Sequence, residues 1–336
     1  MLGPGVVCST IVDELSDLSH SFAIEKALLL LPCNMGLLLF FKNEKDPSQQ
    51  IQDAGFDISE CSHDCESCST SFPSSLKFED DAPLYGSTKP YGLQVVVSTN
   101  KTDWPHDALG QLGTLAHALD SWASSAKFEG LGESAKIKVN TSSLSLPKFE
   151  TDQEYVDEKR GDVLLLPFFV WVKNITVANC AQVLDKVVPD LVLFRDAQKD
   201  TLPLLSYAEF PDVEIVADGN KAYIFMCSHR TRDKRCGVTA PIMKKEMELH
   251  LRDLGLHRDF SDLRPGGVTV AFINHIGGHK FAANVIIYLK KSGKNIWLAR
   301  CKPNNVVPII DECIVHDGKV WPDKVRQVQK FKPVEW

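Results

Sequence analysis

The sequence predicts an α/β fold built from two successive α/β units, on three observations. A chain of 336 residues is long enough for about two domains. Its composition, 44% hydrophobic and 24% charged, is ordinary for a globular protein with a full apolar core. Strand-like apolar runs also alternate with stretches of helical periodicity. We expect the units at residues 56–205 and 206–325, with an unassigned segment at 1–55 and a tail at 326–336.

The first unit is predicted from its pattern of apolar residues. Residues 91–98 are rich in valine and are expected to form a strand. Residues 107–122 are expected to form a helix, because leucine and alanine recur there near helical spacing. Two more strands are expected at 136–139 and 163–172, the second buried on both faces. A second helix is expected at 178–188.

The second unit shows the same kinds of pattern in a clearer order. A strand is expected at 221–226, followed by a helix at 241–254 with Pro241 in its first turn and Gly255 at its end. Residues 268–273 are expected to form the next strand. The remaining expected elements are two strands joined by a hairpin turn, 284–289 and 295–300, and a short helix, 306–315. The order β-α-β-β-β-α fits a thioredoxin-like layer of sheet and helices. The sequence shows no internal repeat.

Charge and the N-terminal region limit the classes of function and location. A net charge of −7 argues against a general nucleic-acid binder. The apolar run at 27–41 is too short to span a bilayer and is expected to form two buried elements around a turn, so we expect no membrane span. The acidic start lacks the features of a secretory or mitochondrial signal. We therefore expect a cytoplasmic location, with the nucleus as the alternative.

Two cysteines and two histidines are the most informative feature of the chain. Cys227 and Cys236 have eight residues between them, and His275 and His279 have three. Each pair lies at the end of a strand-like run. With ten cysteines in a reducing compartment, such a group indicates metal or redox chemistry rather than disulfide bonds. Two thiolates and two imidazoles can hold either a zinc ion or a [2Fe–2S] cluster.

The spacing of these residues favours the cluster and leaves zinc as the alternative. Structural zinc sites usually have two to four residues between paired cysteines. Gly277 and Gly278 would let the backbone N–H groups approach bridging sulfides. A cluster with two cysteine and two histidine ligands is nearly neutral when oxidised, so it is reduced at roughly −150 to +300 mV rather than near −400 mV. His229 is a rival ligand because Cys227-Ser-His229 matches the C-x-H of Rieske sites, but the C-x2-H that accompanies it in those sites is absent here.

Three stretches of this chain resemble the sucrase/ferredoxin-like family of thioredoxin-like [2Fe–2S] proteins. They are residues 103–105 (DWP), 225–237 (FMCSHRTRDKRCG) and 267–285, which contains NHIGGHK. The resemblance covers most of the chain from about residue 60. It implies a thioredoxin-like ferredoxin fold in the C-terminal unit, and a role in electron transfer or redox sensing with an unknown redox partner rather than as a substrate-converting enzyme. The ligands that it implies are Cys227, Cys236, His275 and His279.

A second cysteine group lies nearer the N-terminus. Cys61, Cys65 and Cys68 are spaced like metal ligands, and His63 could be a fourth. A zinc site, a second cluster and a redox-active thiol pair all fit this spacing, as do plain loop thiols. Two alternative functions follow for the whole protein. One is a zinc-stabilised thioredoxin-like binding module, and the other is a thiol oxidoreductase that uses Cys65 and Cys68.

The chain ends in Val334-Glu335-Trp336. A terminal aromatic residue after an acidic one resembles the tail signal by which cytosolic iron–sulfur proteins engage the machinery that inserts their clusters. The sequence therefore predicts recruitment of that machinery by the tail. The alternatives are a frayed terminus and a buried terminal tryptophan.

Overall fold

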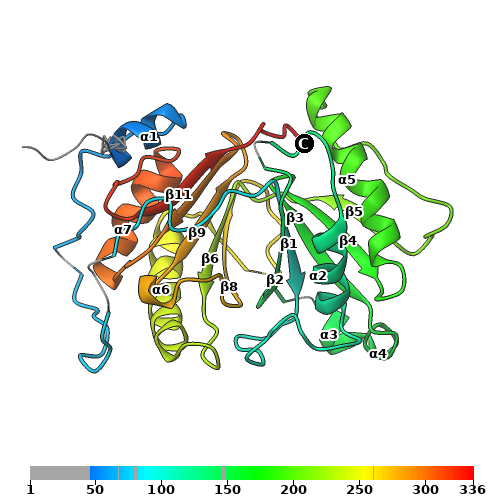
Figure 1. Ribbon diagram of the computed structural model, residues 1–336, viewed down its shortest axis with the longest axis horizontal. Coiled ribbons are helices and arrows are strands. Elements are labelled where there is room, and N and C mark those ends of the chain that lie inside the picture. Colours follow the sequence, from blue (N-terminus) through cyan, green and yellow to red (C-terminus); the bar gives the residue numbers. More distant parts are fainter. Residues whose placement is uncertain (1–45, 67, 79–81, 133, 146–147, 260) are drawn as a thin grey trace, which may run out of the picture. The chain divides into compact units, whose positions relative to one another are not determined.

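The computed structural model describes residues 46–336 except 67, 79–81, 133, 146–147 and 260, so the elements expected at 27–41 lie outside the described residues. The described residues belong to one compact unit. They contain a mixed sheet of eleven strands in the order β11-β10-β9-β6-β8-β2-β1-β3-β4-β5, with β7 beside β8 (Figure 1). The predicted α/β class is confirmed.

The N-terminal half of the sheet runs from β2 to β5. Its strands are β1 (Leu93–Ser98), β2 (Ile137–Ser142), β3 (Gly161–Leu166), β4 (Val170–Ile175) and β5 (Glu214–Ala217), and its helices are α2 (Leu115–Ser125), α3 (Lys148–Thr151), α4 (Gln153–Asp157) and α5 (Cys180–Asp196). The helix expected from residue 107 begins only at Leu115, since Gly113 has a positive φ of 75° and Thr114 caps the helix. The single strand expected at 163–172 is two strands, because Pro167 and the turn at Phe169 separate β3 from β4.

The C-terminal half of the sheet runs from β8 to β11. Its elements are β6 (Ala222–Cys227), α6 (Lys234–Asp253), β7 (His257–Arg258), β8 (Val268–Ile273), η1 (His279–Phe281), β9 (Val285–Leu289), β10 (Lys294–Leu298), η2 (Pro303–Asn305), α7 (Val306–Pro308), η3 (Ile309–Val315) and β11 (Val325–Lys330), and α1 (Pro47–Asp53) precedes both halves. Helix α6 begins well before Pro241, which lies inside it, so Cys236 belongs to its first turn. Part of the predicted tail is strand β11, paired with β10.

The two halves repeat one topology. Strand β1 pairs in parallel with β2 and antiparallel with β3, and the antiparallel series continues through β4 to β5. Strand β6 likewise pairs in parallel with β8 and antiparallel with β9, and the series continues through β10 to β11. A helix connects the two parallel strands in each half, α2 in one and α6 in the other. The fold thus contains a repeat that the sequence does not reveal.

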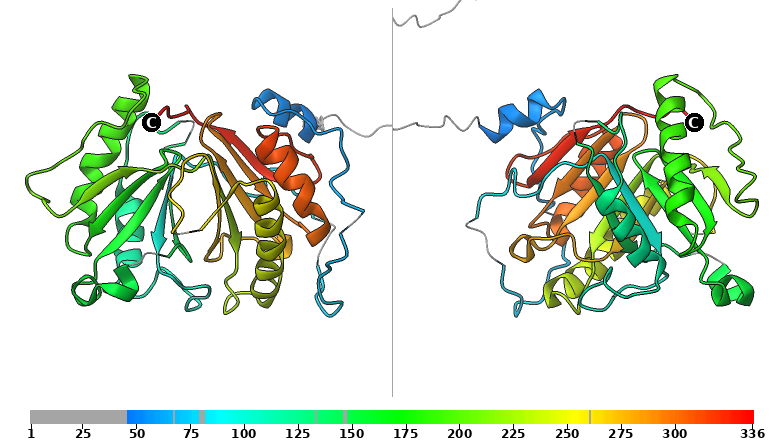
Figure 2. Two further views of the ribbon diagram at one scale, coloured as in Figure 1. Left: turned by 180° about the vertical axis from the view of Figure 1, so that it is seen from behind. Right: turned by 45° about the vertical axis from the view of Figure 1, so that its right-hand side comes forward.

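One face of each half-sheet packs against helices. The opposite face packs against the other half-sheet. On β6, Ile224 and Met226 belong to the core beneath α6, whereas Tyr223 and Phe225 point the other way. These alternate residues join a core shared by both halves, which includes Val96, Leu164, Ile273, Ile286 and Tyr288. Figures 1 and 2 show α6 and α7 beside the C-terminal half-sheet and α2 and α5 beside the N-terminal one.

The two half-sheets join at the carboxyl ends of β2 and β8. The ladder between them is the single pair Ser142 and Ile273. The next residue, Asn274, donates its backbone N–H to the Thr141 carbonyl at 3.0 Å. Its side-chain oxygen accepts hydrogen bonds from the Thr141 N–H (3.1 Å) and from Asn140 Nδ2 (2.7 Å). The carboxyl ends of both parallel strand pairs therefore converge at this joint, where ligands commonly bind in α/β sheets.

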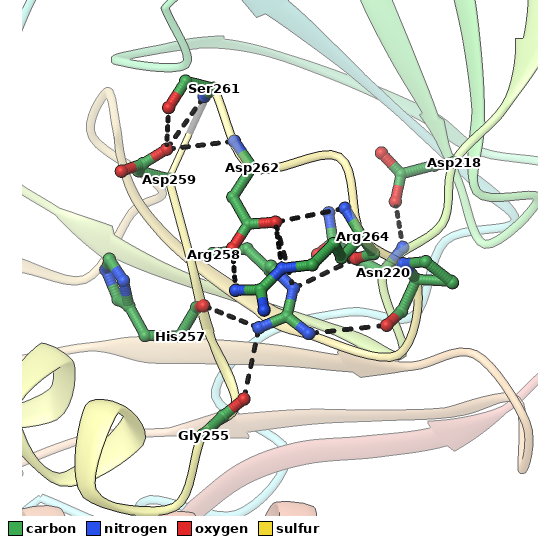
Figure 3. A network of polar contacts seen from close by, with 10 residues as sticks. Asp218, Asn220, Gly255, His257, Arg258, Asp259, Ser261, Asp262 and Arg264 are labelled. Atoms are coloured by element: carbon green, nitrogen blue, oxygen red, sulfur yellow. Dashed lines mark hydrogen bonds and ion pairs between the residues drawn. The ribbon is translucent and has the colours of Figure 1, made fainter.

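Arg258 stabilises the loop between α6 and β8 at the opposite end of these strands (Figure 3). Its Nη1 donates to the carbonyls of Gly255 (3.2 Å) and His257 (2.8 Å), and its Nε donates to that of Arg264 (3.0 Å). Gly267 allows this packing, since a Cβ there would lie 2.0 Å from Arg258 Cγ. This network fixes the amino end of β8 and takes no part in the site described below.

The C-terminal tail is folded into the N-terminal half. Val334 and Trp336 are 4% and 9% exposed and pack in the core beneath α2 and α5. The Trp336 indole Nε1 donates a hydrogen bond to the Phe168 carbonyl at 2.9 Å. The structure thus matches the alternative of a buried terminal tryptophan.

We predict that Trp336→Ala lowers the free energy of unfolding by about 3 kcal/mol, because it removes a large buried ring. Glu335→Ala is the matched control, since Glu335 is exposed, and should change stability by less than about 0.5 kcal/mol. Urea unfolding of the full-length variants measures both. Equal stability of the two variants would contradict the buried position of the tail.

Candidate metal centre

Three of the four predicted ligands lie together. Sγ of Cys227, Sγ of Cys236 and a ring nitrogen of His275 lie within 4.8 Å of one another, the one such group of three found in the described part of the chain. The Cys227 Sγ and the His275 Nδ1 are 3.6 Å apart. Both thiols are almost fully buried, at 2% and 1% exposure, whereas His275 is partly exposed.

Three different elements deliver these side chains to one point. Cys227 is the last residue of β6 and pairs with Ile273, the last residue of β8. His275 follows two residues later, so the parallel pairing places it next to Cys227. Cys236 lies in the first turn of α6, whose start is fixed by the N-cap Asp233. The site therefore depends on how β6, α6 and β8 pack together.

The surroundings of the two thiols stabilise the thiolate of Cys227 and the protonated thiol of Cys236. A hydrogen bond from Cys236 lowers the pKa of Cys227 to about 5, and His275 and the backbone N–H of His229 act in the same direction. The same hydrogen bond, together with burial, raises the pKa of Cys236. Cys227 and Cys236 form one buried apolar cluster with Ala282. Two thiols and an imidazole in such a pocket fit a soft or borderline metal centre, such as zinc or an iron–sulfur cluster.

The two glycines of the histidine loop take backbone conformations that other residues rarely adopt. Gly277 and Gly278 have φ angles of 89° and 74°, and the short helix η1 begins immediately afterwards at His279. The loop therefore turns tightly between the two predicted histidine ligands. The side chain of His279 lies outside what the structure describes, and its role as a ligand stays a prediction.

Arg326 on β11 hydrogen-bonds to this histidine loop. The guanidinium Nη1 donates to the Gly277 carbonyl (3.1 Å) and to Asn284 Oδ1 (2.8 Å), and Nε donates to Ser87 Oγ (3.0 Å). The ring of Phe281 lies 4.7 Å away. Burial lowers the pKa of Arg326 to about 10, so it remains charged at neutral pH. Arg326 lies in the predicted tail with no motif around it, so the sequence does not mark it as part of the site.

His229 is not a ligand in this arrangement. Its Nε2 lies 3.0 and 2.9 Å from the carbonyl oxygens of Trp104 and Pro105, and its Nδ1 accepts a hydrogen bond from the His275 backbone N–H at 3.2 Å. The side chain is 1% exposed. Both ring nitrogens thus have hydrogen-bond partners, which agrees with the sequence argument against His229 as a ligand.

The N-terminal cysteine group lies elsewhere, along α6 and α7. Cys65 donates its backbone N–H to the Asn304 carbonyl at 2.7 Å, and Trp321 Nε1 donates to the Cys61 carbonyl at 2.7 Å. Burial and a hydrogen bond with Cys65 raise the pKa of Cys68 to about 11. Among the residues with described positions, the three sulfurs form no group within 4.8 Å. A second metal site at Cys61, Cys65 and Cys68 stays a prediction.

Comparison with known proteins identifies a family and several fungal relatives. The model of the sucrase/ferredoxin-like family matches residues 84–327. The chain is 36% identical over 306 residues to "Actin patches distal protein 1" of Saccharomyces cerevisiae, which covers 87% of this chain and 93% of the relative. It is 38% identical over 99 residues to "Altered inheritance of mitochondria protein 32" of Debaryomyces hansenii, which covers 29% of this chain and 33% of that protein.

No solved structure matches the chain. The helices among the described residues include none that is long and apolar enough to cross a membrane.

We predict that Gly278→Ala disturbs the histidine loop more than Gly277→Ala. Both positions have positive φ, which costs about 1–2 kcal/mol for alanine. A Cβ on Gly278 would also lie 2.7 Å from Phe281 Cδ2 and 2.9 Å from Arg326 Nη2, whereas a Cβ on Gly277 meets nothing within 4 Å. Urea unfolding and the reactivity of Cys227 and Cys236 toward a thiol reagent measure the effects. Identical behaviour of the two variants would refute the contact with Arg326.

A second prediction concerns the charge of the thiol pair in metal-free protein. Because the pKa of Cys227 is about 5, ultraviolet absorbance of a thiolate should appear as the pH rises through about 5. Cys227→Ser should abolish this step, and His275→Ala should move it to higher pH by removing a hydrogen bond to the thiolate. Cys180→Ser is the control, since burial raises the pKa of Cys180. Persistence of the step in Cys227→Ser would rule out this assignment.

Proposed function

The chain belongs to the sucrase/ferredoxin-like family, and from that premise we propose that it is a [2Fe–2S] protein of electron transfer or redox sensing. The proposed ligands are Cys227, Cys236, His275 and His279. The observation that carries the proposal is the convergence of two buried thiols and one imidazole from β6, α6 and the loop after β8.

The nature of the site favours a cluster over a single zinc ion. The two cysteines come from separate elements and not from one tight knuckle, which suits a core larger than one ion. The positive φ angles of Gly277 and Gly278 allow the tight turn that separates His275 from His279, the fourth proposed ligand. The lowered pKa of Cys227 means that one ligand is already a thiolate at neutral pH.

The bound cluster would supply a one-electron couple, with the two cysteines proposed on one iron and the two histidines on the other. The chain's own residues would tune that couple. Ala282 and neighbouring apolar groups exclude water from the thiols. Arg326 keeps a positive charge behind the loop, which favours the reduced state. His275 is the most exposed of the three described ligands, so we propose that electrons enter and leave on its side.

The repeated topology supports a thioredoxin-like ferredoxin fold for the C-terminal unit. Cys227 ends β6, the first strand of the C-terminal half-sheet, and Cys236 lies in the first turn of the following helix. We retain the proposed units at 56–205 and 206–325, with the first unit covering the site of the second. Strand β5 lies within the second range but pairs with β4 of the N-terminal half-sheet. An electron carrier needs no substrate pocket, and we propose no substrate-converting activity. The redox partner is unidentified.

Location and assembly are proposed from the relatives and the tail. The name of the yeast relative refers to actin patches, which favours a cytoplasmic location, and the names of other relatives refer to mitochondrial inheritance. Val334-Glu335-Trp336 is proposed to recruit the cytosolic iron–sulfur assembly machinery. Because Trp336 is buried, recruitment would require the tail to leave the N-terminal core or to act before that core closes.

We predict that anaerobically purified protein is brown and contains two irons and two acid-labile sulfides per chain. Alanine in place of Cys227, Cys236, His275 or His279 should each abolish or strongly reduce the cluster absorption, since each removes one ligand. Cys301→Ala is the matched control, because Cys301 is equally buried but lies in the core beneath α6.

Metal analysis and an assay of disulfide reduction separate the alternatives. A colourless protein with one zinc per chain would replace the proposal with a zinc-stabilised binding module. Reduction of a disulfide substrate that is lost in Cys65→Ser and Cys68→Ser would indicate a thiol oxidoreductase. Full cluster absorption in any one of the four ligand variants would remove that residue from the ligand set.

A further inference from the structure

One loop of the N-terminal half contacts the loop that connects Cys227 to Cys236. The loop after β1 and the loop after β6 occupy corresponding places in the repeated topology, and they contact each other. Ser228 Oγ donates to the Thr102 carbonyl at 2.7 Å. Asp103 accepts hydrogen bonds from the Thr231 N–H (3.1 Å) and hydroxyl (2.7 Å). His229 lies at the centre of this contact, with the Trp104 ring 5.8 Å away in an edge-on arrangement.

The partners of His229 define its tautomer. Nε2 faces the carbonyl oxygens of Trp104 and Pro105, which can only accept, so Nε2 must carry the hydrogen. Nδ1 faces the backbone N–H of His275, which can only donate, so Nδ1 must be the acceptor. The hydrogen bonds thus assign the donor role to Nε2 and the acceptor role to Nδ1. One side chain thus joins two carbonyls of the first unit to the backbone of a predicted ligand.

We propose that His229 is a positioning residue that orients His275 from the N-terminal half of the chain, an inference that rests on the proposed function of the site. Nδ1 of His229 fixes the peptide N–H of His275, and the neighbouring Asn274 is fixed by Thr141. With the peptide bond that precedes it held in this way, the His275 ring lies with Nδ1 3.6 Å from the Cys227 sulfur. Groups behind a ligand commonly set its orientation and its affinity for metal.

Two substitutions separate the two hydrogen-bonding functions of the ring. In asparagine, Oδ1 is as many bonds from Cα as Nδ1 is in histidine, so His229→Asn keeps an acceptor for the His275 N–H. In glutamine, Nε2 corresponds to Nε2 of histidine, so His229→Gln keeps a donor for the carbonyls of Trp104 and Pro105. A residue that merely fills space would tolerate both substitutions equally.

The test uses full-length, anaerobically purified protein with its cluster and compares these two variants with wild type. Three properties are measured: the electron paramagnetic resonance spectrum of the reduced cluster, the rate of iron loss to a chelator, and urea unfolding. His229→Asn should keep the wild-type spectrum and lose iron within about threefold of the wild-type rate. His229→Gln should change the spectrum and lose iron about tenfold faster, the lower end of effects for groups behind a ligand. Equal spectra and rates in the two variants overturn the proposal.

A second measurement keeps the inference testable if the wild-type protein holds no cluster. Hydrogen exchange of the His275 amide in metal-free protein reports directly on the bond to Nδ1. We expect slow exchange in wild type and His229→Asn, and at least tenfold faster exchange in His229→Gln. Similar exchange in all three proteins overturns the positioning role, whereas absence of a cluster with the expected exchange pattern overturns only the proposed function.

Discussion

The joint between β2 and β8 is the constraint on which the candidate site depends. One ladder pair, Ser142 with Ile273, and the side chain of Asn274 hold the two half-sheets together there. Because the joint lies at the carboxyl ends of the parallel strands, the loops that leave β1 and β6 must meet. The first loop brings Trp104 to His229, and the second, which contains His229, connects the two cysteines. The N-terminal unit therefore belongs to the site although it supplies none of the predicted ligands.

The repeated topology has been put to different uses in the two halves. Strand β1 ends at Ser98, where the corresponding strand β6 ends at Cys227. A hydroxyl is a poor ligand for soft metals, whereas a thiolate is a strong one. The half that ends in serine packs face to face with the half that ends in cysteine. Both thiols are buried in a cluster with Ala282, Ile276 and Phe78, whereas His275 is partly exposed.

Local signals in the sequence predicted much of the fold and pointed to three residues that the structure brings together, Cys227, Cys236 and His275. Strands that are buried on both faces could be predicted because their successive residues are all apolar. The start of α6 was missed because Pro241 resembles a first-turn proline, yet the helix begins earlier and includes Cys236. Arg326 could not be predicted, since its partners are carbonyls and amides far away in the chain. The role of His229 likewise depends on Trp104, a contact that only the tertiary fold creates.

The last residues of the chain tie both halves together, since β11 completes the C-terminal half-sheet and Trp336 enters the core of the N-terminal one. Both β11 and Trp336 follow the rest of the two half-sheets in chain order. A nascent chain can therefore pair β1 with β2 and β6 with β8 before β11 supplies Arg326, which hydrogen-bonds to the histidine loop. The histidine loop thus gains this contact only once β11 has paired with β10.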